Sequence, residues 1–216
     1  MDGVLFDSMP NHAAAWEEVM SRHGLPFTAQ DCYINEGRTG QDVIHEAILK
    51  YEHRNASDEE IWSIYHEKSQ AFLQRGGAEP MRGVKAVLDF LKAQGAQIWI
   101  VTGSGQKSLF DNIEANFPGI FSREKMITAF DVTVGKPNPE PYLKAWERSG
   151  LPKDQCCVIE NAPLGVRAGK AAGLYTIAVN TGPLPDSLLR DEGADQVFTD
   201  MEKLLVFLQN DGFNDK

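Results

Sequence analysis

Apolar residues are spaced differently in two parts of the chain. Between residues 10 and 79 they recur only at helical intervals, as Trp16 and Met20 do. This spacing predicts helices over 11–23, 41–53 and 57–73. Ser57, with Glu60 three residues later, is typical of a helix N-terminus that begins with a capping box. The first part of the chain is therefore predicted to be purely helical.

From Pro80 onward, predicted helices alternate with short apolar strands. Strands separated by helices pair in parallel through right-handed crossovers, which predicts an α/β fold with one doubly wound parallel sheet. The predicted strands are 97–101, 157–159, 175–179 and the less apolar 196–198. The predicted helices are 84–94, 104–116, 139–149, 164–172 and a closing helix at the carboxyl end. We expect an α/β core of residues 1–9 and 80–216, split by a helical cap of residues 10–79 that covers the carboxyl ends of the strands.

Composition narrows the class of protein. The chain has 216 residues, 42% of them hydrophobic, and a formal net charge of -10. No apolar stretch approaches the roughly 18 residues that cross a bilayer, and an acidic surface does not favour nucleic acid or anionic membranes. We expect a cytoplasmic protein that binds neither. The three cysteines favour burial as small apolar side chains over a disulfide or a metal site, above all the adjacent Cys156 and Cys157.

Two polar signals lie beside apolar runs. One is at the start of the chain, and the other follows the strand predicted at 97–101. The chain begins Met1-Asp2-Gly3-Val4-Leu5-Phe6-Asp7-Ser8, so that a carboxylate and a glycine lie beside an apolar stretch. Such an Asp-Gly pair is also common in hairpin turns. Thr102-Gly103-Ser104 places hydroxyl groups at a strand end and at an expected helix start, where free N–H groups favour phosphate. Plain helix capping is the alternative for this second signal.

Two further segments are more specific. Three prolines in 136–141 make the loop Lys136-Pro137-Asn138-Pro139-Glu140-Pro141 rigid and place Lys136 just before a helix. A merely solvated lysine needs no such rigid setting. Glu160 and Asn161 end the apolar strand at 157–159. Their side-chain oxygens are the kind of ligand that a hard divalent cation prefers.

In this order and at these separations, the four segments resemble the haloacid dehalogenase (HAD) superfamily, in the subgroup with a helical cap between the first two motifs. The likeness spans essentially the whole chain. It is greatest to β-phosphoglucomutase-like phosphatases, because Asp7-Ser8-x-x-x-His12-x-x-x-Trp16 and Lys136-Pro137-x-Pro139-x-x-Tyr142 match their pattern. The resemblance implies a magnesium-dependent phosphatase.

The resemblance also implies roles for individual residues. Asp2 would be the general acid and base, and its backbone carbonyl would touch Mg²⁺, which Glu160 and Asn161 would hold. Thr102 and Lys136 would bind the transferring phosphoryl group, with Gly103 and Ser104 beside them. His12 would bond near Asp2 when the cap closes, although a capped surface histidine is an alternative. Metal and lysine together would cancel the charge between an anionic nucleophile and a phosphate dianion.

The chain departs from the HAD pattern in two ways. Many relatives have Glu-Asp where this chain has Glu160-Asn161, which makes one metal ligand neutral. The second departure is larger, because the nucleophilic aspartate and the first strand would lie just before Met1. Losing a central buried strand would cost more than the roughly 5 to 15 kcal/mol by which a domain is stable. We therefore expect a longer natural chain, in which Met1 is internal.

The cap loop 35–40 lies where proteins of this subgroup recognise their substrate. Arg38, flanked by glycines, would present a guanidinium to a second phosphate or a carboxylate, with a helix-end salt bridge as the alternative. Glu36 would repel a polyanion unless it pairs with Arg38 or reaches the metal. We expect the two to narrow the pocket for a small phosphate, such as a short sugar phosphate, phosphoglycolate or pyrophosphate.

Three functions stay open from the sequence. The favoured one is a monomeric phosphohydrolase that forms an aspartyl-phosphate intermediate. The second is a mutase that moves phosphate within a hexose, but Gly105-Gln106 stands where mutases often have a phosphate-binding lysine. The third is a binding or regulatory protein without catalysis, because the chain as written lacks the nucleophilic aspartate.

Overall fold

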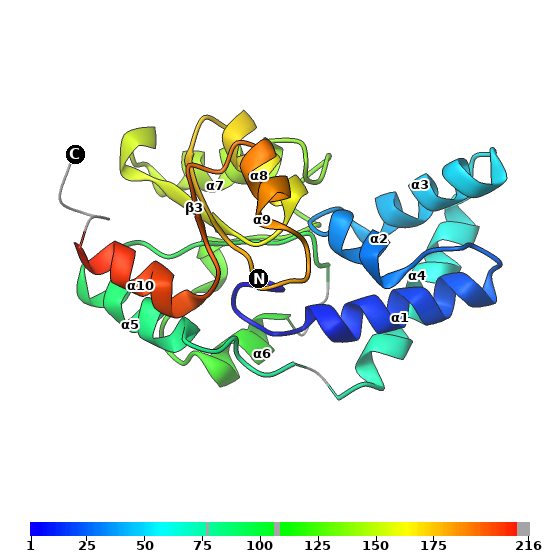
Figure 1. Cartoon of the computed structure of the whole chain (residues 1–216), viewed down its shortest axis with the longest axis horizontal. Coiled ribbons are helices and arrows are strands. Elements are labelled where there is room, and N and C mark those ends of the chain that lie inside the picture. Colours follow the sequence, from blue (N-terminus) through cyan, green and yellow to red (C-terminus); the bar gives the residue numbers. More distant parts are fainter. Residues whose placement is uncertain (77, 106–108, 211–216) are drawn as a thin grey trace.

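The computed structural model describes residues 1–76, 78–105 and 109–210. Figure 1 shows four helices on one side of the molecule and the mixed helices and strands on the other. The sequence-based contrast between a helical stretch and an α/β stretch is therefore confirmed as an order of elements. The exact division into core and cap, and any movement between them, stays a prediction.

The helical segment, which we define as α1 to α4, has a hydrophobic core of its own. Trp16, Val19, Ile44 and Ile64 are among its buried residues. Ser57 caps α4 by accepting a hydrogen bond from the N–H of Glu60. Helix α2 was not predicted, because six residues are too few to show a helical period. The helices are α1 (Met9–Arg22), α2 (Ala29–Ile34), α3 (Gly40–Glu52) and α4 (Asp58–Leu73).

The α/β part follows the predicted alternation, with additions. Strand β2 and helix α9 were missed because both are too short to leave a periodic pattern. Its helices are α5 (Val84–Ala93), α6 (Leu109–Asn116), α7 (Glu140–Ser149), α8 (Pro163–Ala171), α9 (Asp186–Asp191) and α10 (Met201–Asn210), with 3₁₀ turns at Arg123–Lys125 and Lys153–Gln155. Its strands are β1 (Ile100–Val101), β2 (Met126–Ile127), β3 (Cys157–Glu160), β4 (Tyr175–Val179) and β5 (Gln196–Phe198).

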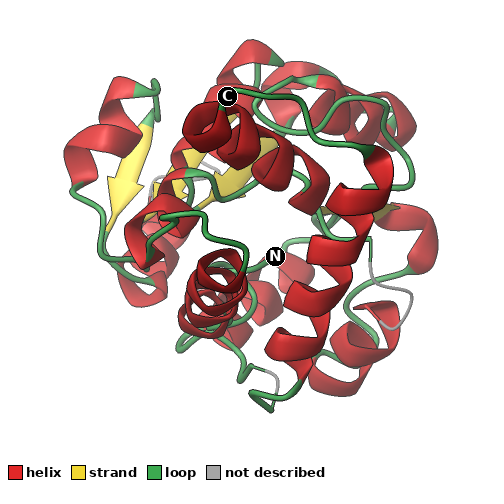
Figure 2. Cartoon of the chain, turned by 90° about the vertical axis from the view of Figure 1, so that its right-hand side faces the viewer, coloured by secondary structure: helices red, strands yellow, loops and turns green. Residues whose placement is uncertain are grey.

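All of these strand pairs are parallel, as predicted, but the described residues form two sheets and not one. One sheet has the order β1-β2 and the other β3-β4-β5. Figure 2, turned so that the side of the helical segment faces the viewer, shows strands partly covered by helices near the middle and one uncovered strand at the left. Because parallel strands share one direction, the carboxyl ends of β1 and β3 can both carry site residues.

Three local predictions were wrong. Strand β1 covers two residues and not 97–101, since only Ile100 and Val101 have a partner strand. Ser104 and Gly105 precede α6 without being helical, and the rest of the predicted helix start, 106–108, lies outside the described residues. Cys157 is exposed and Cys156 is only half-buried, because the amino end of β3 lies at the surface. No disulfide joins the described cysteines.

The two connections between the helical segment and the α/β part run side by side. The N–H of Asp7 donates to the carbonyl of Glu79 at 2.9 Å, and the N–H of Met81 donates to Leu5 at 2.8 Å. Phe6 and Pro80 form an antiparallel bridge between these connections. The chain thus leaves and re-enters the α/β part at one point, which is the geometry that a hinge requires. Within the described ranges, no helix is both long and apolar enough to span a bilayer.

Candidate active site

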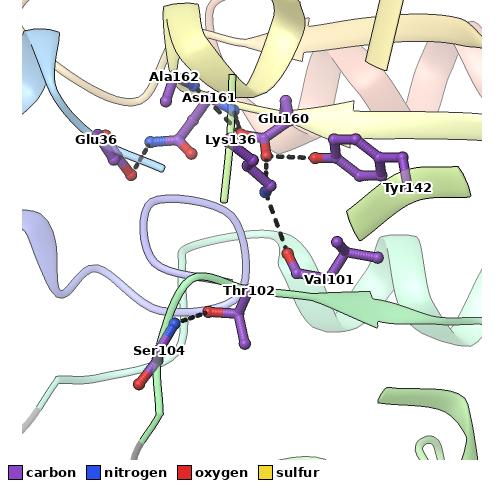
Figure 3. Close-up of polar contacts among 9 residues, drawn as sticks. All are labelled: Glu36, Val101, Thr102, Ser104, Lys136, Tyr142, Glu160, Asn161 and Ala162. Atoms are coloured by element: carbon purple, nitrogen blue, oxygen red, sulfur yellow. Dashed lines mark hydrogen bonds and ion pairs between the residues drawn. The ribbon is translucent and has the colours of Figure 1, made fainter. Parts of the chain in front are cut away.

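Lys136 links the carboxyl ends of β1 and β3. Its Nζ donates to the carbonyl of Val101 at 3.2 Å and to Oε1 of Glu160 at 2.5 Å, as Figure 3 shows. Its ammonium also lies 4.7 Å from the centre of the Tyr142 ring. Both members of the ion pair are buried, with side-chain exposures of 5% and 8%. The lysine predicted from the proline-rich loop is therefore a buried cation at the strand ends.

Glu160 is surrounded by donors. The hydroxyl of Tyr142 donates to Oε1 at 2.5 Å, and the N–H groups of Asn161 and Ala162 donate to Oε2 at 3.1 and 3.4 Å. Burial acts to raise the pKa of Glu160, but the charges of Lys136 and the α-amino group, with the hydrogen bonds from Lys136 and Tyr142, lower it to about 2. Glu160 is thus a carboxylate that holds Lys136 in place. Its predicted part in metal binding stays a prediction.

Thr102 follows β1 directly and is buried. Its N–H donates to the carbonyl of Ile127 at 2.9 Å, and its hydroxyl oxygen accepts the N–H of Ser104 at 3.1 Å. The strand pairing and this turn therefore fix the hydroxyl group. Gly103 lies against the helical segment, because a Cβ there would meet the carbonyl oxygen of Arg38 at 3.0 Å.

Asp2 lies at the start of a chain of polar contacts that enters the helical segment. Its Oδ1 accepts from the Ser8 hydroxyl at 2.5 Å and lies 3.3 Å from Nε2 of His12. Nδ1 of His12 in turn lies 2.7 Å from Nζ of Lys68. A lysine ammonium can only donate, so Nδ1 of His12 accepts and its Nε2–H is left to face Asp2. Phe72 stacks on the imidazole with ring centres 4.0 Å apart.

Burial shifts the pKa values of the charged groups in this series of contacts. Burial would raise the pKa of Asp2, but the interactions with His12, the α-amino group and Ser8 bring it below its ordinary value. Burial lowers the pKa of His12, and the nearby Lys68 lowers it further. Burial also lowers the pKa of Lys68 to about 8. At neutral pH, Asp2 is therefore an ionised carboxylate held by neutral donors.

Sequence reasoning missed Lys68. The apolar stripe of α4 consists of Ile61, Ile64 and Ala71, and Lys68 occupies a position on that same buried stripe. Its side chain is 6% exposed and lies over the rings of Trp16 and Phe72. A charged residue in phase with a buried stripe was the available signal, since such residues are almost never fully buried without a partner.

The loop between α2 and α3 brings Glu36 onto the core. The Asn161 amide donates to Oε1 of Glu36 at 2.8 Å (Figure 3). Burial raises the pKa of Glu36 to about 8, with the charges of Glu160 and Asp2 adding to the increase against the Asn161 bond. Among the described residues, no ion pair joins Glu36 to Arg38, whose buried Nε has no hydrogen-bond partner. Of the two alternatives for Glu36, the pair with Arg38 is not formed, and contact with a metal stays a prediction.

A cavity of about 170 Å³ lies between the helical segment and the strand ends. We call it the substrate cavity. It brings together the residues to which the sequence gave a catalytic, substrate-binding or metal-binding role: Asp2, His12, Glu36, Arg38, Thr102, Gly103, Ser104, Lys136, Glu160 and Asn161. Within the described part of the chain, no three His, Cys, Asp or Glu side chains form a ready-made metal cage.

Thr102 and Glu160-Asn161 lie at the ends of parallel strands, Lys136 lies between these strand ends, and all of them line one cavity with Asp2. This arrangement fits a HAD-like hydrolase of the β-phosphoglucomutase-like subgroup. The sequence model of the haloacid dehalogenase-like hydrolases matches residues 1–173, and the chain belongs to this family.

Individual relatives agree with this placement. Hexitol phosphatase A of Escherichia coli is 30% identical over 98% of this chain and 94% of its own length. Glycerol-1-phosphate phosphohydrolase 1 of Saccharomyces cerevisiae is 30% identical over 95% of this chain and 82% of its own. A solved structure titled as a putative β-phosphoglucomutase from Bacteroides vulgatus superposes with a TM-score of 0.93 at 47% identity, over 97% of this chain and 85% of that one. The relatives named as phosphatases support phosphate-ester hydrolysis as the activity of the family around this chain.

Proposed function

We propose that this protein is a Mg²⁺-dependent phosphohydrolase that acts on a small phosphate compound through an aspartyl-phosphate intermediate. The observation that carries the proposal is the buried Lys136, which Glu160 holds beside the Thr102 hydroxyl on the wall of the substrate cavity. A buried cation next to a fixed donor suits a phosphoryl group, whose oxygens gain charge in the transition state.

Each residue around the substrate cavity has a part in this reaction. An aspartate joined to Met1 would attack phosphorus while Lys136 and Thr102 bind the phosphoryl oxygens. Asp2, once protonated, would give its proton to the leaving oxygen and then take one from the attacking water. The N–H of His12 and the hydroxyl of Ser8 orient Asp2 for both steps. Arg38 would bind the far end of the substrate.

The oxygens around Glu36 fit a hard cation. Burial raises the pKa of Glu36 to about 8, and the charges of Glu160 and Asp2 add to the increase. A divalent ion held by Asp2, Asn161 and Glu36 or Glu160 would offset this concentration of carboxylates. Bound Mg²⁺ would supply charge neutralisation for the phosphoryl oxygens.

The first test is the genomic sequence ahead of the Met1 codon. An in-frame apolar run that ends in aspartate would define the enzyme to assay, which we call the extended enzyme. An in-frame stop codon without another start would contradict catalysis and favour a binding protein, which would bind phosphate or metal without turnover.

In the extended enzyme, we expect Asp2→Asn to lower kcat on phosphate monoesters by about 10²- to 10⁴-fold, because proton transfer to the leaving group is lost. Phosphate release would be measured against Asp89→Asn, a surface change on α5. If Asp2→Asn keeps full activity with both good and poor leaving groups, Asp2 is not the acid.

The substrate preference is expected to depend on Glu36. We expect Glu36→Ala to widen the substrate cavity and to shift kcat/KM from pyrophosphate and phosphoglycolate toward hexose and hexitol phosphates by about tenfold, roughly 1.4 kcal/mol. A panel of these substrates would be compared for the two proteins, with Glu46→Ala on the outer face of α3 as the control. An unchanged ranking of substrates would contradict the proposed selection by size.

A mutase is the second candidate, supported by the 47% identity to the Bacteroides vulgatus protein and by the unpartnered Nε of Arg38 on the cavity wall. Residue Gln106, which argued against it, lies outside the described residues. Isomerisation of β-glucose 1-phosphate that depends on glucose 1,6-bisphosphate would favour the mutase. Release of inorganic phosphate alone would favour the hydrolase.

A further inference from the structure

The loop between α2 and α3, residues 35–39, lies against the α/β part of the molecule, and we call it the joining loop. The Asn161 amide donates to Oε1 of Glu36 at 2.8 Å (Figure 3). Glu36 and Arg38 both line the substrate cavity from this loop. The depth at which the joining loop lies on the α/β part therefore decides how far these two side chains extend into the cavity.

Two glycines of the α/β part lie directly against the joining loop. A Cβ on Gly135 would meet Cγ2 of Thr39 at 2.9 Å, whereas carbon atoms that are not bonded prefer about 3.5 to 4.0 Å. A Cβ on Gly103 would meet the carbonyl oxygens of Arg38 and Gly37 at 3.0 and 3.1 Å. Neither Gly103 nor Gly135 has a positive φ, so the backbone itself would accept alanine. The close approach of the joining loop therefore excludes a side chain at both positions.

The Thr39 side chain is fixed in the orientation that brings its methyl group to Gly135. Its hydroxyl accepts the N–H of Asp42 at 3.2 Å and donates to Oδ2 of Asp42 at 2.7 Å, which caps the start of α3. A branched side chain also has few rotamers. Gly135 is buried and directly precedes the loop that prolines hold rigid. An added methyl group at Gly135 would therefore displace the joining loop as a whole, away from the substrate cavity.

We propose that Gly135 is a positioning residue for substrate recognition: its contact with Thr39 sets the depth of the joining loop and so places Arg38 for the second anionic group of a small substrate. In the proposed function, Lys136 and Thr102 bind the phosphoryl group from the α/β part, whereas Arg38 binds from the helical segment. A substrate with two anionic groups spans both sides, and inorganic phosphate needs only the first. This assignment of sides rests on the proposed function, but the contact between Gly135 and Thr39 does not.

The contact is tested with Gly135→Ala, Thr39→Ser and the double variant Gly135→Ala/Thr39→Ser. Thr39→Ser removes Cγ2 but keeps the hydroxyl that caps α3, because serine is at least as good an N-cap as threonine. Val134→Ala, at an exposed neighbour in the same loop, is the control. Titration calorimetry with Mg²⁺ would measure the affinity for imidodiphosphate, a pyrophosphate analogue that resists hydrolysis, and separately for inorganic phosphate. Thermal unfolding would be recorded for each variant.

We expect Gly135→Ala to weaken imidodiphosphate binding by about 10- to 100-fold, because a small displacement of a positioning group is costly. Its affinity for inorganic phosphate should change by less than about twofold. The double variant should bind imidodiphosphate within about threefold of Thr39→Ser alone, because the new methyl group takes the space of Cγ2. In Gly103→Ala the added methyl group meets backbone oxygens, so Thr39→Ser should restore nothing there.

Two results would overturn the positioning role of Gly135. One is an unchanged affinity for imidodiphosphate in Gly135→Ala, or a loss that the double variant does not restore. The other is an equal loss for imidodiphosphate and inorganic phosphate, which would mean general damage to the fold. Phosphate release by the extended enzyme tests the proposed function separately. Its absence, with the expected pattern of binding intact, would overturn the proposed function and leave the role of Gly135 standing.

Discussion

Replacing Lys136 by methionine in the extended enzyme is expected to lower kcat by at least about 10³-fold and the free energy of unfolding by about 3 to 5 kcal/mol. Activity falls because the phosphoryl oxygens lose their buried cation. Stability falls because the Glu160 carboxylate, 8% exposed and bonded to Lys136, would be left as an uncompensated charge. Urea unfolding and single-turnover phosphate release would measure the two effects.

A double variant tests whether the stability lost in Lys136→Met comes from the unpaired Glu160 charge or from altered packing. In Lys136→Met/Glu160→Gln, the neutral amide can still accept from Tyr142, so most of the lost stability should return while activity stays low. Recovery of both stability and activity would contradict the assignment of Lys136 to the phosphoryl group. A single Lys136→Met variant as stable as the parent would show that the ion pair is not buried in solution.

Several residues that the structure brings into the substrate cavity carry local signals in the sequence. Thr102 and Glu160 stand at the ends of short apolar runs, and Lys136 stands in a loop that prolines hold. Because the ends of parallel strands meet at one edge, local signals were enough to bring these side chains together. Asp2 and His12 were found through the family pattern.

The features that were missed depend on tertiary structure. Lys68 reaches His12 across 56 residues of sequence, and only the packing of α4 against α1 brings the two together. The separation of the strands into two sheets could not be read from local patterns either, since the pairing of β1 and β3 depends on what lies between them. The hydrogen bond between Glu36 and Asn161 of the core was also missed, because it joins two residues that lie far apart in the sequence.

Lys68→Met is expected to stabilise the protein by about 2 kcal/mol at pH 7 while lowering kcat/KM about 10- to 100-fold. Burial lowers the pKa of Lys68 from 10.5 to about 8, so keeping it charged costs free energy of about 1.4 kcal/mol per pKa unit, part of which its contacts with His12 and Trp16 return. Activity falls because Nδ1 of His12 loses the donor that fixes its tautomer. Lys50→Met, at a lysine 62% exposed in its side chain, is the control and should change stability by less than about 0.5 kcal/mol.

The stability gained by Lys68→Met is expected to depend on pH. Below pH 8, Lys68 is charged in both the folded and the unfolded chain, and the full cost of burying the charge is present. Between pH 8 and 10.5 the unfolded chain binds the extra proton, so the stability contributed by Lys68 rises with pH. The advantage of Lys68→Met should therefore be constant up to about pH 8 and disappear by about pH 10.5. An advantage that persists unchanged at pH 10.5 would show that it comes from packing and not from charge.

The pH profile of kcat/KM in Lys68→Met tests whether Lys68 positions His12. A purely structural role of Lys68 would leave this profile unchanged. The charge of Lys68 helps to lower the pKa of His12, after burial, so its removal should raise that pKa. The acid limb of the kcat/KM profile should then move to higher pH, because His12 becomes protonated earlier and pairs more tightly with Asp2. Lys68→Arg, which keeps a donor facing Nδ1, should restore the original limb. A lower kcat/KM with an unmoved acid limb would mean that Lys68 supports the fold alone and does not position His12.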